Sequence, residues 1–212
     1  MNAVQAKTRR RSQRDTTTSR HQDLRDQLLA AADRTIAAEG LPALRARALA
    51  ESVGCSVGAI YNIFSDLDAL ILAVNGRTLG AIDQVMRNLV PDADPAAQIV
   101  LLAEAYLDYA AEQRQRWTAL FSHRMSDNRA VPPWYKEQQS AAFSHVESPL
   151  AALRPDLPAE ERALLARTLF TAVHGMVALG LDETLATMEL PVLREQVRIV
   201  AQVLARGLTT DR

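Results

Sequence analysis

The stretch that decides how this chain folds is "AESVGCSVGAIYNIFS", residues 50–65. It places Gly54 and Gly58 four residues apart among helix-forming residues, although glycine destabilises a helix interior. Gly54 stands where a left-handed residue would end one helix. Ser56 suits the N-cap of the next, since its hydroxyl can accept from a backbone N–H two or three residues later. Only residues 53–55 separate the two helices, so they must meet at a steep angle, which is the layout of a helix-turn-helix.

The second helix of this pair is predicted to carry a surface for DNA. Gly58 falls in its first turn, and the missing side chain lets the backbone approach another surface, which we interpret as a phosphate. Tyr61 and Asn62 are expected to project outward near the same end, towards a phosphate and a base respectively, since asparagine can pair with adenine. The alternative is a packed tyrosine and a solvated asparagine. Ile60 and Phe64, four residues apart, are expected to hold the helix to the core.

The rest of the sequence predicts helices and no strand, and therefore an all-α fold of about nine helices. Gly40, Pro91 and Pro149 are expected to end or kink helices, while Asp66 and Asp94 are expected to cap them. In addition to the helix that Ser56 caps, the predicted helices cover residues 21–39, 45–52, 67–89, 95–113, 115–125, 133–153, 158–181 and 191–207.

Charge is distributed unevenly along the chain of 212 residues, whose net charge is −1. Residues 1–62 hold ten basic and six acidic residues, a net charge of +4, which leaves −5 for the remainder. A basic N-terminal part indicates a polyanionic partner for that part alone. We therefore divide the chain into a disordered basic arm (1–20), a three-helix helix-turn-helix DNA-binding domain (21–66) and a C-terminal helical domain (67–212).

Several classes of protein find no support in the sequence. The four histidines lie far apart with no paired-ligand spacing, and no nucleotide-binding or zinc-protease motif is present, so we expect no metal, no cofactor and no enzyme. Cys55, the single cysteine, is interpreted as a small apolar plug in the turn, with a redox sensor as the alternative. The uncharged run of residues 168–181 is shorter than the roughly 20 residues that span a bilayer. We therefore expect a cytoplasmic protein with no membrane partner.

The residues around the opening stretch resemble the N-terminal domain of the TetR family of transcriptional regulators. The similar pattern covers residues 24–74, with Gly40, Leu49-Ala50, Val53-Gly54, Ser56-x-Gly58, Ile60-Tyr61, Phe64 and Ala69-Leu70. The stretches "AYLDYAAEQRQRWTALF" and "FTAVHGMVALGL" resemble the WHG-type effector domain of the same family, with Phe170 at the place of its tryptophan.

This resemblance implies a regulator, which we expect to be a repressor. It implies a homodimer whose two helix-turn-helix domains bind a palindromic operator in successive major grooves, about 34–36 Å apart. It also implies that an unknown small molecule binds the C-terminal domain and releases the DNA. The last two helices are expected to pair with those of the partner subunit, through Leu169, Val173, Met176, Val197, Val200 and Leu204.

The sequence departs from the family at several expected phosphate contacts. Arg45 replaces the usual threonine, Val57 a frequent lysine, and Ser65-Asp66-Leu67 lacks the usual lysine. We hypothesise that Arg45, Arg47 and the arm replace these contacts. The predicted DNA-binding residues are Arg9, Arg10, Arg11, Arg45, Arg47, Ser56, Val57, Gly58, Ala59, Tyr61 and Asn62.

Aromatic, methionine and histidine side chains of the C-terminal part are the candidates for effector binding. They are Trp117, Phe121, Met125, Phe143 and His174. These residues could line an apolar pocket between helices, or they could pack a core, and a histidine on an apolar helix is more often a hydrogen-bonded core residue. The alternatives to a regulator are an all-helical enzyme or carrier that uses such a pocket, and an interaction protein with a degenerate DNA-binding domain.

Overall fold

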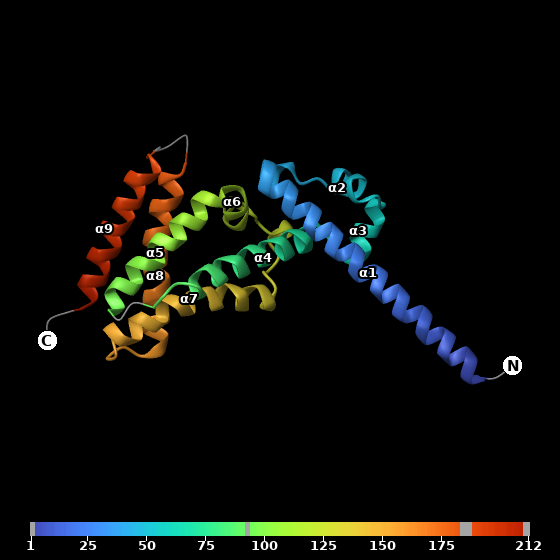
Figure 1. Cartoon of the computed structure of the whole chain (residues 1–212), viewed down its shortest axis with the longest axis horizontal. Coiled ribbons are helices and arrows are strands. Elements are labelled where there is room, and N and C mark those ends of the chain that lie inside the picture. Colours follow the sequence, from blue (N-terminus) through green and yellow to red (C-terminus); the bar gives the residue numbers. More distant parts are fainter. Residues whose placement is uncertain (1–2, 92–93, 183–187, 210–212) are drawn as a thin grey trace. The chain divides into compact units, whose positions relative to one another are not determined.

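The chain is helical throughout the computed structural model, which describes residues 3–91, 94–182 and 188–209. Within these residues there is no strand, which confirms the predicted all-α fold (Figure 1). The elements are α1 (Ala3–Glu39), η1 (Leu41–Ala43), α2 (Ala46–Val53), α3 (Val57–Ile63), α4 (Leu67–Arg87), α5 (Pro95–Glu112), α6 (Arg114–Ser122), η2 (Ser126–Asn128), α7 (Pro133–Leu153), α8 (Ala159–Gly180) and α9 (Leu190–Leu208).

The helices form two compact units, and each unit consists of two separate stretches of the sequence. Unit 1 consists of Met1–Asn75 and Thr118–Arg129, and unit 2 of Gly76–Trp117 and Ala130–Arg212. The boundary that we predicted after Asp66 therefore lies inside unit 1. Helices α4 and α6 each contribute residues to both units.

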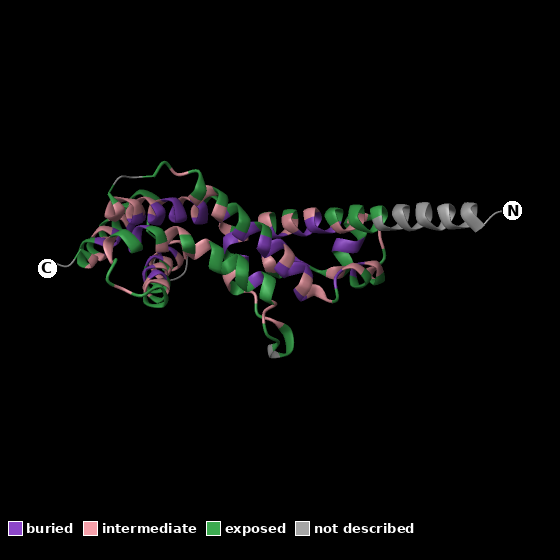
Figure 2. Cartoon of the chain, turned by 90° about the horizontal axis from the view of Figure 1, so that it is seen from below, coloured by how far each residue is buried: buried purple, intermediate pink, exposed green. Residues whose placement is uncertain are grey.

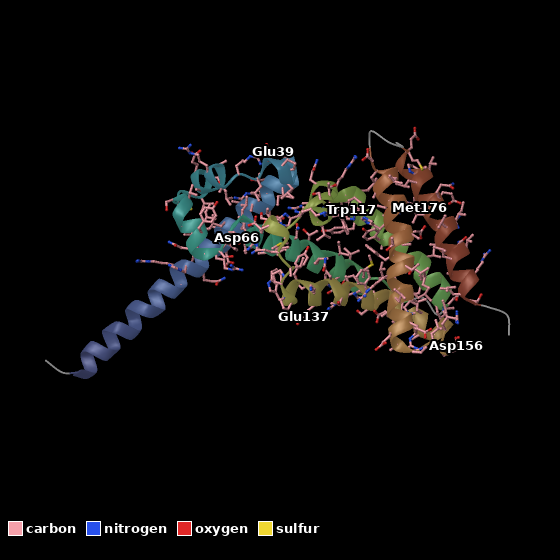
Figure 3. All side chains as sticks on the ribbon, turned by 180° about the vertical axis from the view of Figure 1, so that it is seen from behind. Glu39, Asp66, Trp117, Glu137, Asp156 and Met176 are labelled. Carbon is pink, nitrogen blue, oxygen red and sulfur yellow. The ribbon has the colours of Figure 1, made fainter. Side chains whose placement is uncertain are left out.

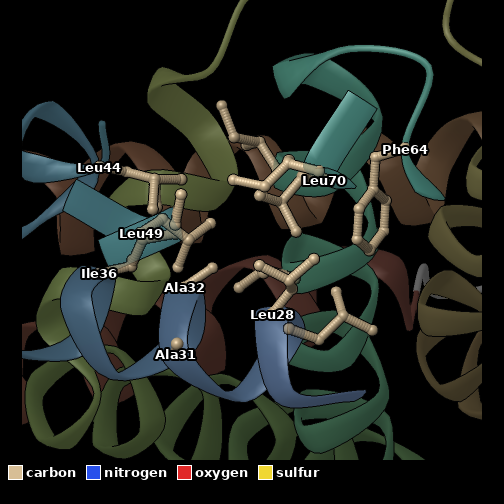
Figure 4. Close-up of a cluster of buried hydrophobic side chains, with 14 residues drawn as sticks. Leu28, Ala31, Ala32, Ile36, Leu44, Leu49, Phe64 and Leu70 are labelled. Carbon is tan, nitrogen blue, oxygen red and sulfur yellow. The ribbon is translucent and has the colours of Figure 1, made fainter. Parts of the chain in front are cut away.

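Unit 1 is built around an apolar core that α1, α2, α3 and α4 share, and Figure 4 shows most of it. Leu28, Ala32 and Ile36 repeat every four residues along α1 and are fully buried, as the sequence pattern predicts. Leu49 from α2 and Phe64 after α3 pack into the same cluster. This core holds α2 and α3 against α1, and so sets the direction in which α3 faces outward.

Helix α1 begins at Ala3, whereas we expected a disordered arm over residues 1–20 and a helix from about His21. The first residue in the chain that commonly ends a helix is Gly40. Arginine, alanine and glutamine, which are common before it, all favour helix. The backbone therefore has no local reason to leave the helical conformation. We had interpreted the lack of an apolar stripe as a lack of helix, and that inference does not hold for this segment.

Unit 2 packs α5 against α7, α8 and α9. Its core contains Ile99 from α5, Leu150 from α7, Ala166 and Leu169 from α8, and Ala205 from α9. A side chain at Gly180 would overlap the side chain of Leu193, so this glycine permits the close approach of α8 and α9. Figure 2 shows the buried residues on the inward sides of the helices and the exposed ones opposite. Helix α7 runs through Pro149, which is buried.

Candidate nucleic-acid interface

The turn between α2 and α3 has the geometry that the two glycines predict. Gly54 ends α2 in the left-handed conformation, with φ 75° and ψ 34°, and its N–H donates to the carbonyls of Ala50 and Glu51. Ser56 caps α3, because its Oγ accepts from Ala59 N at 3.1 Å. Both features confirm the predicted helix-turn-helix.

Helix α3 presents one flank to solvent and buries the other. Ile60 is fully buried and Phe64 is 2% exposed, whereas Tyr61 is 46% exposed and Asn62 is also exposed. Gly58 is exposed, and a Cβ built there would meet only Ser56 Oγ, at 3.8 Å. The predicted contacts Ser56, Gly58, Tyr61 and Asn62 therefore lie at the surface. Val57 and Ala59 are half-buried beside them.

Arg45 and Arg47, at the start of α2, differ in how freely their side chains can move. Arg45 occupies the N-cap position, but its side chain does not cap the helix. Instead its guanidinium donates to the carbonyls of Pro42 and Leu44, which holds the exposed side chain close to the backbone. Arg47 has a side chain that is 90% exposed, and its Nε lies 3.9 Å from Glu51 Oε1. A pair this exposed contributes little stability, so Arg47 can reach another surface at little cost.

Of the predicted arm contacts Arg9, Arg10 and Arg11, the structure describes the backbone, as part of α1. Their side chains lie outside the described part, so their role stays a prediction.

The carboxylate of Asp66 caps α4, as the sequence predicts, and it is also neutralised. Its Oδ1 accepts from Ala69 N at 2.8 Å, and its Oδ2 accepts from Arg129 Nη1 at 2.8 Å. The hydrogen bond from Arg129 is the main cause of a lowered pKa of Asp66. Sequence reasoning missed Arg129, because nothing in its neighbourhood of the chain points to a residue 63 positions away.

Two of the predicted effector-site residues form a hydrogen-bonded cluster in unit 2. Trp117 Nε1 donates to Tyr106 Oη at 2.8 Å, and Tyr106 Oη lies 2.8 Å from His174 Nδ1. The phenol oxygen carries one proton and two lone pairs, so Tyr106 can donate to His174 Nδ1 or accept from it, depending on the imidazole tautomer. Burial lowers the pKa of His174 and raises that of Tyr106, which agrees with two uncharged groups.

Aromatic rings extend this cluster. Phe170 stacks on His174 with ring centroids 5.5 Å apart, and Phe143 meets the edge of Phe170 at 5.2 Å. The structure thus brings Trp117, Phe143 and His174 together. Figure 3 labels Trp117 among the side chains. Tyr106, the centre of the cluster, was missed. It lies on α5 and Trp117 on α6, so helical spacing within one segment does not predict their contact. The other two candidates, Phe121 and Met125, belong to unit 1.

The residues that we assigned to a dimer interface lie largely inside the single chain. Val197 is fully buried, and Leu169 and Val173 are also buried. Leu204 packs against the core of unit 2, while Met176 and Val200 are half-buried. Sequence periodicity finds an apolar stripe on α9, but this stripe faces the protein's own core. A second set of apolar side chains is exposed on α8 and α9, consisting of Leu164, Leu179, Leu190, Val192, Ile199 and Val203.

Helix α8 passes a test of length and composition for a membrane-spanning helix. In the sequence we considered only its uncharged run, residues 168–181, which is shorter than a span. Only 28% of its most apolar window is buried inside the chain. The bent pair of α3 and α4 passes the same test when taken as one span. In the part of the chain that the structure describes, no group of three or more His, Cys, Asp or Glu residues could hold a metal ion.

Comparison with known proteins agrees with this geometry. A family model described as "Bacterial regulatory proteins, tetR family" matches residues 28–74, and one described as "Tetracyclin repressor-like, C-terminal domain" matches residues 99–206. No curated protein sequence matches the chain significantly.

Solved structures share the fold at low sequence identity. A protein of unknown function from Rhodococcus sp. RHA1 is 23% identical, with a TM-score of 0.70 over 88% of this chain and 96% of that chain. A transcriptional regulator from the same organism is 19% identical, with a TM-score of 0.64 over 89% and 99%. The TetR family regulator PfmR from Thermus thermophilus is 17% identical, with a TM-score of 0.58 over 87% and 99%.

The fold and the exposed helix α3 define a DNA-binding regulator of the helix-turn-helix class. Since one family model spans more than half of the chain, the chain belongs to the TetR family of bacterial transcriptional regulators. This confirms the family that the sequence resembles, which is a family of transcriptional regulators.

Proposed function

We propose that this protein is a cytoplasmic repressor that binds a palindromic operator as a homodimer and releases it when a small molecule binds unit 2. The observation that carries this proposal is the exposed side of α3, where Gly58 has no side chain. The opposite side of the helix is buried through Ile60, which fixes the exposed side towards solvent. Because Gly58 carries no side chain, a phosphate can approach the backbone of α3 closely at this position.

The residues around this flank have distinct roles in the proposed contact. Tyr61 donates its hydroxyl to a phosphate, and Asn62 reads a base edge. Arg47 supplies a mobile positive charge to the backbone of the duplex. Arg45 is held by carbonyls of its own loop, so it contributes charge with less reach.

An electrophoretic or anisotropy measurement with the intergenic DNA beside the protein's own gene tests the proposal. Two salt concentrations separate the candidates. A specific regulator prefers this DNA to a mixed-sequence duplex at both concentrations, with affinity that falls as salt rises. A protein that ignores every duplex at low salt would instead be an interaction protein with a degenerate DNA-binding domain.

The dimer is proposed to form through the exposed apolar side chains of α8 and α9. On α9, Val192, Ile199 and Val203 are spaced by seven and four residues, so they share one face of the helix. This face lies beside the buried stripe and does not include it. A second copy suits α8 better than a bilayer, because its exposed side also carries Arg167, Thr168 and Thr171.

A pair of substitutions on α9 tests this interface. Val203→Asp, at an exposed position, is expected to give monomers of unchanged helicity in analytical ultracentrifugation. Leu204→Asp, at a position packed against the core of unit 2, is expected to lower the unfolding midpoint instead. If Val203→Asp remains fully dimeric, the dimer forms elsewhere.

The effector is proposed to bind at the cluster of Trp117, Tyr106 and His174. Aromatic faces and a fixed polar edge suit a small, mainly apolar molecule with a hydrogen-bonding group. Such a ligand must bind the DNA-free conformation more tightly than the DNA-bound one, since otherwise it shifts no equilibrium. Quenching of Trp117 fluorescence, compared with that of a Trp117→Phe variant, identifies molecules that bind there.

A further inference from the structure

Residues 118–129 carry an anomaly that the proposed function does not use. They lie inside the sequence matched by the C-terminal domain of the family, residues 99–206, yet they belong to unit 1 together with the helix-turn-helix. One anchor is apolar, since Ala119 is part of the unit 1 core. Another is polar, since the buried Asn75 on α4 donates through Nδ2 to Ala119 O at 3.4 Å.

The strongest attachment is ionic and centres on Asp68 in the first turn of α4. Asp68 is 6% exposed, and its Oδ2 accepts both from Ser126 N at 2.8 Å and from Arg129 Nη2 at 2.8 Å. The other terminal nitrogen of Arg129 binds Asp66 at 2.8 Å, so one guanidinium joins two carboxylates. His123 Nε2 lies 3.5 Å from Asp68 Oδ1. We call Asp66, Asp68, Ser126 and Arg129 the carboxylate clamp.

The closed clamp supplies hydrogen-bond partners for the buried carboxylate of Asp68. Burial alone would raise the pKa of Asp68, but the hydrogen bonds from Ser126 and Arg129 outweigh it and hold that pKa below its ordinary value. Opening the clamp would therefore leave a charged carboxylate without its partners, which buried groups do not tolerate. Burial lowers the pKa of His123, so a neutral imidazole completes the surroundings of Asp68.

The position of the clamp connects it to DNA binding. Asp66 follows Phe64, which anchors the end of α3 in the core, by two positions. An open clamp places two unpaired carboxylates directly after α3, where the phosphates of a duplex would repel them. A closed clamp neutralises one of these charges and holds the start of α4.

We propose that unit 1 binds DNA with the carboxylate clamp closed, and that Arg129 is the residue that positions the clamp. Any loosening of residues 123–129 then lowers the affinity for DNA. This inference rests on the proposed DNA-binding function and specifies how it is regulated. Coupling is reciprocal, so DNA binding must also close the clamp. The test therefore needs no effector.

The Ser126 amide reports the state of the clamp directly, because it donates to Asp68. Hydrogen exchange of the full chain is measured with and without a mixed-sequence duplex at low salt, and binding is followed by anisotropy. In the wild type, we expect DNA to slow exchange at Ser126 by about 5- to 10-fold. Arg129→Gln is expected to speed exchange without DNA, to lose the effect of DNA and to weaken DNA binding by a similar factor.

Arg124→Gln is the matched control. It removes the same charge from the same segment, but Arg124 is exposed and donates only to the carbonyls of Phe121 and His123 in its own turn. It is expected to behave as the wild type. If Arg129→Gln lowers helicity, Arg129→Lys, which keeps the positive charge but cannot bridge both carboxylates, takes its place with a smaller effect in the same direction.

The outcomes separate this inference from the function on which it rests. If DNA binds the wild type but does not change hydrogen exchange at Ser126, the proposed role of the clamp is wrong, whereas the proposed DNA-binding function is unaffected. Equal losses of affinity in Arg129→Gln and Arg124→Gln also overturn it, since charge alone would then explain both. If the wild type binds no duplex, the proposed function fails and the clamp has no role in it.

Discussion

Substitution of Gly58 by glutamate separates the fold of α3 from its proposed use. In the free protein the change is expected to be harmless, because a Cβ at this position meets only Ser56 Oγ, at 3.8 Å. Position 58 lies in the first turn of α3, where glutamate replaces a poor helix former and complements the helix dipole. Together these effects are worth about 0.5–1.5 kcal/mol in favour of the folded state.

Against DNA the same substitution acts in the opposite direction. A carboxylate about 5 Å from a phosphate, at an effective dielectric constant of about 20, costs about 3 kcal/mol, which is about two powers of ten in affinity. Gly58→Ala adds bulk without charge, and its loss of affinity measures the close approach alone. Ala38→Glu adds the same charge at an exposed position near the end of α1 and is expected to change affinity by less than about threefold.

Anisotropy with labelled operator and urea unfolding measure both sides of this prediction. The expected result is a protein at least as stable as the wild type that binds DNA about 100-fold more weakly. If Gly58→Glu binds with unchanged affinity and salt dependence, the exposed flank of α3 does not read DNA. Loss of helicity together with binding would show that Gly58 serves the fold, contrary to the open space around it.

Three further predictions concern the acidic residues, the aromatic cluster and the arm. Asp66 and Asp68 have lowered pKa values in the folded protein, so their stabilisation is present above the ordinary carboxyl value of about 3.9 and is lost as the pH falls through the folded values. Acid unfolding of Asp68→Asn should accordingly depend less on pH below about 4 than that of the wild type, and parallel curves would contradict this. Tyr106→Phe removes the partner shared by Trp117 and His174 and is expected to cost about 1–3 kcal/mol in urea unfolding, whereas an unchanged midpoint would mean that the two bonds do not form in solution. Deletion of residues 1–18 is expected to reduce the slope of log affinity against log salt by about 3 if Arg9, Arg10 and Arg11 each neutralise one phosphate, and an unchanged slope would remove the arm from the interface.

Local signals in the sequence located most helix boundaries. Gly54, Ser56, Asp66 and Asp94 act through their own backbone conformation or through a hydrogen bond a few residues away. Such effects depend on neighbours in the chain and can be read without the fold. The arm was the exception, since we expected disorder where α1 continues to Ala3.

The exposed face of α3 was also predictable, because it follows from helical periodicity once Ile60 and Phe64 are assigned to the core. Periodicity could not tell which apolar stripe of α9 faces the protein and which faces outward. Val197 and Ile199 are both β-branched and apolar, yet the first is buried and the second exposed. Only the packing of α9 against α5 and α8 separates the two stripes.

The amino-acid sequence by itself determined the helix-turn-helix, because caps, turns and one amphipathic core are properties of short segments. It also carries the resemblance to the TetR family that the family models confirm. The tertiary structure alone decided that residues 118–129 join the DNA-binding unit, that Arg129 bridges Asp66 and Asp68, and that Tyr106 joins Trp117 to His174. The physical reason is that hydrogen bonds and ion pairs between residues about 60 positions apart depend on where packing places the two segments, and no local pattern records that position.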